Sequence, residues 1–388
     1  MKQIWMVFLV LVSFCPLKAQ DVPVKTGAEI TSEYFPLLKK KKIAILSNQT
    51  GMVGKEHLVD LLHRKGFNVV ALFSPEHGFR GNADAGEHVS SSTDEKTGIP
   101  IKSLYDGKTS SPSEEVMNSF DLLIVDLQDV GLRYYTYYAT MIKMMDACAE
   151  YHKKVLILDR PNPNGFYVDG PILDMKYKSG VGWLPIPIVH GMTLGELALM
   201  ANGEKWLDKG RTCDVTVIKC KNYTHQTRYK LPIAPSPNLP NMKAVYLYPS
   251  TCFFEATPVS LGRGTALPFQ VYGHPNMIGY TYSFTPRSMP GAKTPPQMDK
   301  LCFGKNLSNL SDEEIIKNGV DLSYLIDAYN NLNMGDHFFR PFFELLVGRD
   351  YVRKMIIAGK SASEIKAAWQ EDVINFKKQR APYLLYAE

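Results

Sequence analysis

The sequence predicts an α/β protein, with a Rossmann-like parallel-sheet subdomain followed by a second, smaller α/β or α+β subdomain. In the first half, short and continuously apolar runs alternate with helical patterns, and a polar loop follows each run. Continuously apolar strands are typical of a parallel sheet that helices cover on both faces. The length of 388 residues exceeds the usual size of a single core, so we expect two subdomains.

Four apolar runs are the expected strands of this sheet: Lys42–Ser47, Asn68–Phe73, Asp121–Asp126 and Lys154–Asp159. A helix is expected from Glu56 to Lys65, because its leucines fall on one face and Gly66 follows as a cap. A second helix is expected from about Tyr137 to Tyr151. The loops after parallel strands meet at one edge of the sheet, where open α/β proteins bind their ligands.

The pattern changes near His190. Thr193 and Glu196 have the spacing of a capping box, which predicts a helix through Ala201. A strand is expected at Val215–Lys219, and proline-rich loops around Pro235–Pro240 follow it. A helical tail is expected from Asp321 to Phe376. The expected organisation is a signal peptide at 1–20, the Rossmann-like subdomain at 21–190 and the second subdomain at 191–388.

The composition is that of a globular protein, with 45% hydrophobic and 21% charged residues. The net charge of +5 is spread along the chain. The basic run Lys39–Lys42 is explained as a solvent-exposed segment that precedes a strand, so no nucleic-acid partner is expected. Beyond residue 20 the cysteines are scattered and odd in number, which argues against a disulfide framework and predicts buried free thiols.

The N-terminus has the pattern of a secretory signal peptide. Lys2 precedes an apolar run from Ile4 to Phe14, and small residues near Ala19 supply a cleavage point. The run is shorter than the roughly 20 apolar residues of a membrane span. We therefore expect a secreted or periplasmic protein with no integral membrane segment after cleavage.

No cofactor is expected. The loop after the first strand, Ser47–Gly51, lacks the three spaced glycines of a dinucleotide site. The Glu/His pairs of the chain lack the helical spacing of a zinc site, so no metal is assigned.

The loop after the second strand carries the densest group of chemically active side chains. Glu76, His77 and Arg80 lie in the run Ser74–Gly81, and Glu87 follows beside a second histidine. These residues suit general acid/base catalysis, with a carboxyl group that holds its proton near neutral pH. Metal ligation and simple loop stabilisation by hydrogen bonds explain the same spacing equally well.

The loop after the third strand combines Gln128, Asp129 and Arg133 with Tyr135 and Tyr137. Tyrosines offer flat amphipathic surfaces, and with Asp, Gln and Arg they suit a sugar ring with apolar faces and hydroxyl edges. Two alternatives remain open. The tyrosines can be core residues, and Arg133 can be the buried partner of a nearby aspartate.

Further polar residues flank the expected strands and loops as candidate ligand contacts. Glu255 lies in apolar company, and Arg263 lies between two glycines as an anion-binding candidate. His190 either faces a cleft or caps the following helix. The remaining candidates for substrate binding are Asn48, Asp159, Arg160, Asn162 and Asn238.

Taken together, several ordered motifs resemble the exo-β-N-acetylmuramidase (NamZ-type) family of peptidoglycan glycosidases. They cover the chain from about Lys42 to Tyr386 and are Leu46–Gly51, Phe73–Gly81, Asp126–Gly131, Leu158–Pro163, His190–Thr193, Pro235–Asn238 and Gly262–Thr265. A departure is His274 in Gly273–Asn276, where the family more usually has alanine.

The resemblance implies release of N-acetylmuramic acid from the non-reducing end of peptidoglycan fragments, in cell-wall turnover or recycling, with the active site between two subdomains. It also implies that Glu76 is the leading catalytic residue. We favour Asp129 as the second carboxyl group, because it follows a neighbouring strand of the sheet and lies beside Gln128 and Arg133, which can orient it. If Asp129 points into the core or is tied to a backbone turn, Glu87 takes its place. Arg80, Arg133 or Arg263 is expected to bind the lactyl carboxylate.

The expected partners are peptidoglycan-derived oligosaccharides or muropeptides. Two other functions fit the same residues. One is a periplasmic protein that binds muropeptides without cleaving them, and the other is a metal-dependent hydrolase of muropeptides.

Overall fold

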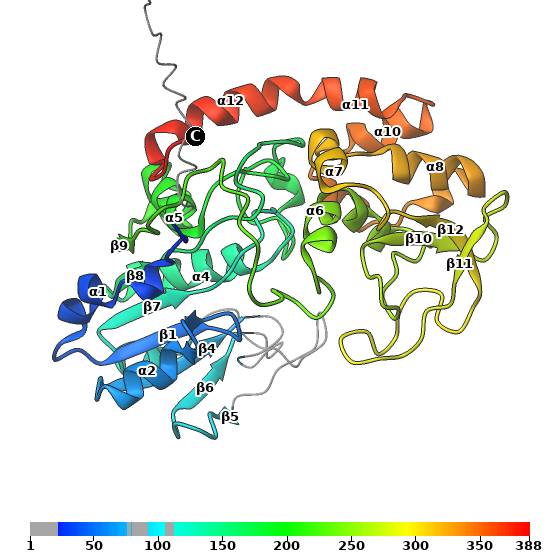
Figure 1. Cartoon of the computed structure of the whole chain (residues 1–388). Coiled ribbons are helices and arrows are strands. Elements are labelled where there is room, and N and C mark those ends of the chain that lie inside the picture. Colours follow the sequence, from blue (N-terminus) through cyan, green and yellow to red (C-terminus); the bar gives the residue numbers. More distant parts are fainter. Residues whose placement is uncertain (1–21, 76–78, 80–91, 105–111) are drawn as a thin grey trace, which may run out of the picture.

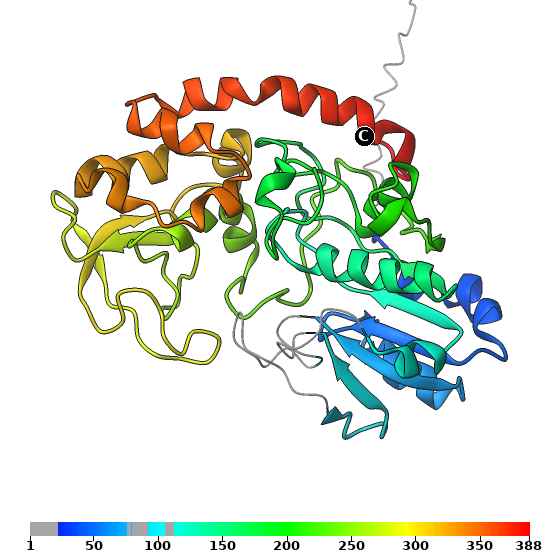
Figure 2. The ribbon, with the colours of Figure 1, turned by 180° about the vertical axis from the view of Figure 1, so that it is seen from behind.

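The computed structural model describes residues 22–75, 79, 92–104 and 112–388. Figures 1 and 2 show a parallel sheet with its helices at one end of the molecule and a smaller sheet with further helices at the other. The helices α10, α11 and α12 run along the top of the molecule in Figure 1, above both sheets. We call the region through β9 the N-terminal part and the region from α6 onward the C-terminal part.

The N-terminal part contains a seven-stranded sheet with the order β5-β6-β4-β1-β7-β8-β9. Its strands are β1 Ile43–Ser47, β4 Val69–Ser74, β5 Ser92–Thr93, β6 Pro100–Ser103, β7 Leu122–Asp126, β8 Lys154–Leu158 and β9 Asp214–Ile218. All neighbouring pairs are parallel except β5 with β6. The four expected strands and the expected parallel sheet are therefore confirmed.

The sheet is buried on both faces, which explains its continuously apolar strands. Ala44 and Leu46 of β1 belong to one core, with residues of α4 Tyr137–Glu150 and α5 Leu194–Gly203. Ile43 and Ile45 belong to a second core on the opposite face. That second core includes residues of α1 Thr31–Leu38 and α2 Leu58–Arg64, whereas α3 Glu114–Asn118 adds Met117 to the first.

Two details differ from the sequence prediction. Residues Glu56–His57, expected to begin a helix, form the short strand β3 opposite β2 Met52–Val53. The helix then starts at Leu58, because the His57 side chain accepts a hydrogen bond from the backbone of Val59. In addition, β9 completes the sheet from a position beyond residue 190, where we expected the first subdomain to end.

The C-terminal part holds a three-stranded antiparallel sheet and a series of helices. The strands, in the order β10-β12-β11, are β10 Val271–His274, β12 Cys302–Asn306 and β11 Tyr282–Phe284. The helices are α6 Met242–Thr251, α7 Asp312–Asn318, α8 Ser323–Leu332, α9 Phe343–Val347, α10 Tyr351–Ile357, α11 Ala362–Ala368 and α12 Gln370–Arg380. Short 3-10 turns lie at 27–29, 175–177, 208–210, 252–256, 335–338 and 381–383.

The helical tail is confirmed, although it ends at Arg380 and not at Phe376. The sequence analysis missed α6 and the small sheet. A proline inside the helix, Pro249, and the glycines and prolines between the short strands hid both patterns. The capping box before α5 is confirmed, with Thr193 and Glu196 bonded to each other's backbone N–H groups.

A buried arginine joins the two parts. The guanidinium of Arg133 is fully buried and donates to four backbone carbonyls. Two of these belong to Pro171 and Ile186 of the N-terminal part, at 2.8 and 2.9 Å, and two to Leu346 and Val347 of α9, at 2.9 and 2.7 Å. Burial lowers the pKa of Arg133 to about 10, which still leaves it charged at neutral pH. Its expected roles in ligand binding or in pairing with an aspartate are therefore wrong.

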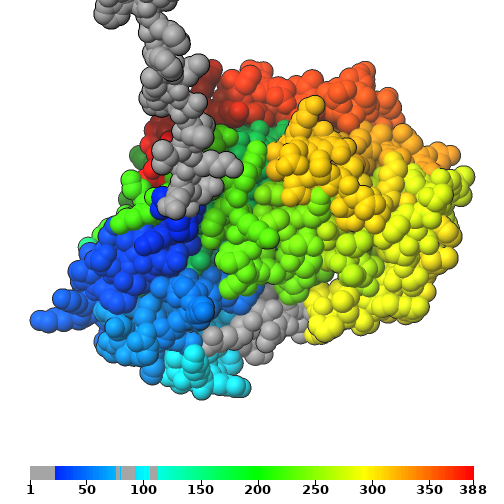
Figure 3. Space-filling view, viewed as in Figure 1, coloured from blue at the N-terminus to red at the C-terminus, as the bar shows by residue number. Residues whose placement is uncertain are grey.

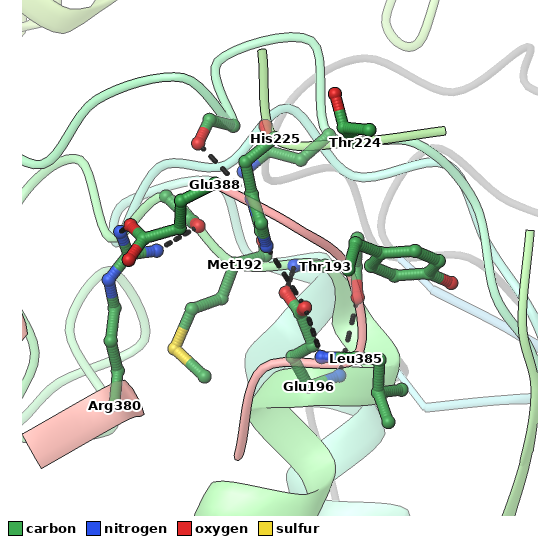
Figure 4. Close-up of polar contacts among 12 residues, drawn as sticks. Met192, Thr193, Glu196, Thr224, His225, Arg380, Leu385 and Glu388 are labelled. Carbon is green, nitrogen blue, oxygen red and sulfur yellow. Dashed lines mark hydrogen bonds and ion pairs between the residues drawn. The ribbon is translucent and has the colours of Figure 1, made fainter. Parts of the chain in front are cut away.

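The C-terminal segment 384–388 returns to the N-terminal part (Figure 4). The Leu385 N–H donates to the Glu196 carboxylate at 2.7 Å, and the same carboxylate lies 3.0 Å from His225 Nε2. The Tyr386 hydroxyl donates to Asp159 at 2.6 Å. The segment therefore closes over the start of α5 and the end of β8.

All five cysteines in the described part of the chain are buried free thiols, as expected. Among the helices that the structure describes, none combines the length and apolar character that crossing a membrane requires.

Replacement of Arg133 by leucine is expected to lower the free energy of unfolding by at least about 3 kcal/mol, because it leaves several buried carbonyls without a donor. Urea denaturation of the purified variant measures this change. The control is Arg287→Leu, which removes a largely exposed ion pair with Asp299 and is expected to change stability by less than about 1 kcal/mol. Equal effects of the two substitutions would contradict the structural role of Arg133.

Candidate active site

The carboxyl edge of the large sheet is the candidate site. From β1 the chain adds β4 and β6 on one side and then crosses back to add β7, β8 and β9 on the other. The strand order thus reverses between β1 and β7, and open α/β sheets bind ligands at such a reversal. The loops that follow β1 and β7, Asn48–Gly51 and Leu127–Gly131, flank this point.

Asp126 and Asp129 each keep one carboxylate oxygen without a hydrogen-bond partner within the described residues. Asp126 forms an ion pair with Arg160 through its other oxygen, whereas no ion pair with a described residue neutralises Asp129. The Oδ1 of Asp129 accepts from the Gly131 N–H at 2.7 Å, whereas its Oδ2 is buried and has no hydrogen-bond partner within the described residues. Burial raises the pKa of Asp129 to about 7, and hydrogen bonds from backbone N–H groups oppose that shift. Asp129 is therefore tied to a turn by one oxygen but keeps the other, and it can hold or release a proton near neutral pH.

Of the two reasons for which we favoured Asp129, its place after a neighbouring strand is confirmed and its orientation by neighbouring side chains is wrong. Gln128 and Arg133 were expected to orient its carboxylate. Instead, the Gln128 side chain donates to the carbonyls of Asp129 and Pro161, at 2.9 and 2.7 Å, and Arg133 binds other carbonyls. The turn at Gly131 orients the carboxylate. Asn162 lies so close to Gly131 that a side chain at that position would collide with it.

Arg160 and Asp126 form a buried ion pair beside this turn. The Arg160 Nε donates to Asp126 Oδ1 at 2.6 Å, and the two side chains are 5% and 0% exposed. The guanidinium also donates to the carbonyl of Met52. Arg160 therefore joins the loops of three strands, and this pairing does not support its expected role in substrate binding.

Tyr135 and Tyr137 bring the proline-rich loop to the sheet edge. Both hydroxyls donate to the Pro235 carbonyl, at 2.8 and 3.2 Å, and the rings lie 4.5 Å apart. The Gln49 side chain donates to the same carbonyl at 3.2 Å from the other side. Both tyrosines line a pocket, whereas Tyr138 lies in the core and accepts from the Trp183 N–H.

A second ion pair lines two pockets, one of which also contains residues of the N-terminal part. Arg263 and Glu255 lie 2.5 Å apart, are 18% and 24% exposed, and line both pockets. The Arg263 guanidinium also lies over the Phe269 ring, 5.0 Å from its centroid. The structure thus brings both candidates to a pocket that also contains Tyr135 and Tyr137, and a carboxylate already partly neutralises the arginine.

Several other candidates hold the loops in place. Asp159 accepts from Thr193, Gly195 and Tyr386, and burial raises its pKa to about 6. Asn162 bonds the backbone of Asn164 and Met192. These buried contacts do not support direct substrate binding by either residue.

The side chain of His190 forms a hydrogen bond with the backbone two residues later. Its Nδ1 accepts from the Met192 N–H at 3.2 Å, so of the two roles expected for it the cap before the helix is the one observed. Burial, and secondly the charge of Arg380, lower the pKa of His190 to about 3, so the ring is neutral at physiological pH.

Asn48 and Asn238 are buried and shape two loops of the edge. Asn48 Oδ1 accepts from both the N–H and the hydroxyl of Thr50, and its Nδ2 has no partner in the described part of the chain. Asn238 donates to the Gly291 carbonyl at 2.7 Å. Sequence reasoning missed the contacts of Gln49 and Thr50, although both residues lie in the motif Leu46–Gly51.

The expected catalytic residues Glu76, His77 and Glu87, and the expected anion-binding residue Arg80, lie outside the described residues. The described strand β4 ends at Ser74, at the same edge as Asp129. Within the described ranges, no group of three or more His, Cys, Asp or Glu side chains has the arrangement of a metal site.

The chain matches two family models along most of its length. They are described as the N-terminal and C-terminal parts of exo-β-N-acetylmuramidase NamZ, and they match residues 43–243 and 246–386. The chain is also 37% identical over 394 residues to peptidoglycan β-N-acetylmuramidase NamZ of Bacillus subtilis, an alignment that covers 95% of this chain and 92% of that protein.

Crystal structures of two DUF1343-family proteins from Bacteroides fragilis have the same fold. One is 72% identical with a TM-score of 0.90, covering 95% of this chain and 100% of the other. The second is 28% identical with a TM-score of 0.78, covering 94% and 99%. With its two-part α/β fold, this protein is thus a glycoside hydrolase. It belongs to the exo-β-N-acetylmuramidase NamZ family.

Asp129→Asn is expected to remove a pH dependence of stability between about pH 4 and pH 7. The pKa of Asp129 is about 7 in the folded protein and about 3.9 in an unfolded chain. Between these values the folded state holds a proton that the unfolded state releases, so the free energy of unfolding falls as pH rises, by up to about 1.4 kcal/mol per pH unit. The amide cannot titrate.

Urea denaturation at pH 4.5 and pH 7 tests this expectation. The variant should gain stability relative to the parent on going to pH 7. Asp208→Asn, at a largely exposed side chain, serves as the control and should follow the parent at both pH values. A parallel pH dependence of parent and Asp129→Asn would show that Asp129 is ionised throughout.

Proposed function

We propose that this protein is an exported exo-acting glycosidase that releases N-acetylmuramic acid from the non-reducing end of peptidoglycan fragments. Membership of the NamZ family carries the proposal, since the relative from Bacillus subtilis is named for this activity on peptidoglycan. The signal-peptide pattern of residues 1–20 supports export to the compartment that contains the substrate. A role in cell-wall turnover follows from the substrate.

In the proposed mechanism Glu76 is the general acid and Glu87 the second carboxyl group. Asp129 is tied to the turn at Gly131, and Glu87 was expected to take its place in that case. Glycosidases use two carboxyl groups on either side of the scissile bond, one of which protonates the leaving oxygen. The unpartnered Oδ2 of Asp129 and its pKa near 7 support a role in proton transfer or in stabilising a positively charged transition state. Asp129 is therefore kept as the alternative second carboxyl group.

Arg263 is the proposed recognition group for the lactyl carboxylate, together with Arg80. N-acetylmuramic acid differs from N-acetylglucosamine by this anionic group, so a cation is the simplest means to distinguish the two sugars. Arg263 supports the proposal because it is partly exposed in a pocket lined by tyrosines. Binding of the lactyl carboxylate would compete with Glu255 for the guanidinium.

Glu76→Gln is expected to lower kcat on a MurNAc-GlcNAc disaccharide by about 10²–10⁴-fold, because the amide cannot donate the proton. Chromatographic analysis of the products follows the release of free N-acetylmuramic acid. Glu150→Gln, a partly exposed residue paired with Arg211, is the matched control and should retain full activity. If Glu76→Gln turns over substrate within threefold of the parent, Glu76 is not the general acid. If the parent itself does not cleave the disaccharide, the protein is better explained as one that binds muropeptides without cleaving them.

Arg263→Ala is expected to raise KM for a MurNAc glycoside by about tenfold or more, because a hydrogen bond to a charged group is lost, while KM for the corresponding GlcNAc analogue changes little. Steady-state kinetics on both substrates measure the difference. Arg211→Ala, another arginine in an ion pair, is the control. If KM rises equally for both sugars, Arg263 has no part in recognising the lactyl group.

A further inference from the structure

A groove in the C-terminal part has the features of a second ligand site. It lies between the strands β11 and β12 and the helices α7 and α8, at the end of the molecule opposite the large sheet (Figures 1 and 2). The yellow and gold segments that supply it adjoin on the face seen in Figure 3. Its volume of about 650 Å³ falls within the ~300–1,000 Å³ typical of small-molecule sites.

Three tyrosines and a glycine shape the groove. Tyr280 and Tyr282 come from the β11 side and Tyr324 from the first turn of α8. Tyr282 lies directly opposite Gly304 in the sheet. A side chain at Gly304 would collide with the Tyr272 carbonyl, so the position opposite Tyr282 carries none.

Some polar groups along the groove are already paired. The hydroxyls of Tyr280 and Tyr272 both donate to Asp327, at 2.8 and 2.5 Å, and Lys305 lies 3.1 Å from the same carboxylate. These contacts fix one wall of the groove and neutralise its lysine.

Other polar groups along the groove are half-buried or exposed and have no partner among the described residues. Within the described residues, the hydroxyls of Tyr282 and Tyr324, the carboxylate of Glu314 and the side-chain amide of Asn309 form no hydrogen bond with another side chain or the backbone. They come from three different elements and line one cavity. A ligand with several hydroxyl and amide groups would satisfy them together, whereas an apolar ligand would bury them unpaired.

The charge of the groove selects against anions. With Lys305 paired to Asp327, the carboxylates of Glu314 and Asp321 remain on the opposite wall. Burial, followed by the charges of these two carboxylates, raises the pKa of Tyr324 to about 12, so its hydroxyl stays a donor. An acidic sugar such as N-acetylmuramic acid is disfavoured here, and a neutral one is not.

We propose that this groove binds the neutral N-acetylated sugar units of a glycan, as a site separate from the catalytic edge. The apolar faces of such rings match the tyrosines, and their hydroxyl and acetamido groups match the free polar groups. The inference rests on the proposed function only for the source of the glycan. It adds a second point at which the enzyme holds a chain while another part of that chain is cleaved.

Titration calorimetry with chitotetraose, a neutral β-1,4-linked tetramer of N-acetylglucosamine, tests the site on the full chain. Chitotetraose has no N-acetylmuramic acid at its end and therefore is no substrate of the proposed reaction. Tyr324→Ala is expected to weaken its binding by about tenfold, because a ring contact is lost. Asn309→Trp, at an exposed position, should fill the groove and weaken binding similarly without affecting the fold.

Asn375→Trp, at an exposed position on α12, is the matched control and should bind chitotetraose as the parent does. Cleavage of a small aryl MurNAc glycoside should stay within twofold of the parent in all three variants. Absence of chitotetraose binding, or binding unchanged in both groove variants, would overturn the proposal. If the parent does not cleave the aryl glycoside but the groove variants still weaken chitotetraose binding, the proposed glycosidase function is contradicted and the second binding site is supported.

Discussion

The buried guanidinium of Arg133 is the interaction on which the arrangement of the two parts depends. It satisfies carbonyls from the N-terminal part and from α9 at once, with no carboxylate beside it in the described part of the chain. A buried charge without a counter-ion is unfavourable unless several dipoles surround it, and the four carbonyls supply those dipoles. Separation of the parts would remove half of them. The pocket that contains Arg263 and Tyr135 draws its walls from both parts and therefore depends on this contact.

Most of the described polar residues at the carboxyl edge of the sheet form contacts that hold the loops together. Asp126 holds Arg160, Asp159 holds the start of α5 and the C-terminal segment, and Asn162 packs against the turn at Gly131. These side chains are buried, and their hydrogen bonds hold the loops of the edge together. Loops held in this way keep a reacting group in one orientation, and this lowers the entropy lost when a substrate binds. At this edge Asp126 and Asp129 each retain one carboxylate oxygen without a hydrogen-bond partner within the described residues.

The C-terminal segment provides a further long-range constraint. Tyr386 shares the carboxylate of Asp159 with Thr193. Leu385 shares the carboxylate of Glu196 with His225 (Figure 4). Each of these carboxylates is buried and needs several donors to remain so. Donors from the last residues of the chain complete both sets. The loop that follows β8 therefore has its final shape only when the C-terminal segment is in place.

The sequence by itself determined the parallel sheet, the helices on its faces and the family. The strand Ile43–Ser47 is continuously apolar through Leu46 because both of its faces are buried. The capping box at Thr193 is a local interaction over three residues. The tertiary structure decided which polar residues are free to meet a ligand. Arg133 and Leu346 are 213 residues apart, and Asp159 and Tyr386 are 227 apart. Hydrogen bonds over such separations leave no pattern in the sequence, so a buried structural arginine and an anion-binding arginine look alike until the fold brings their partners together.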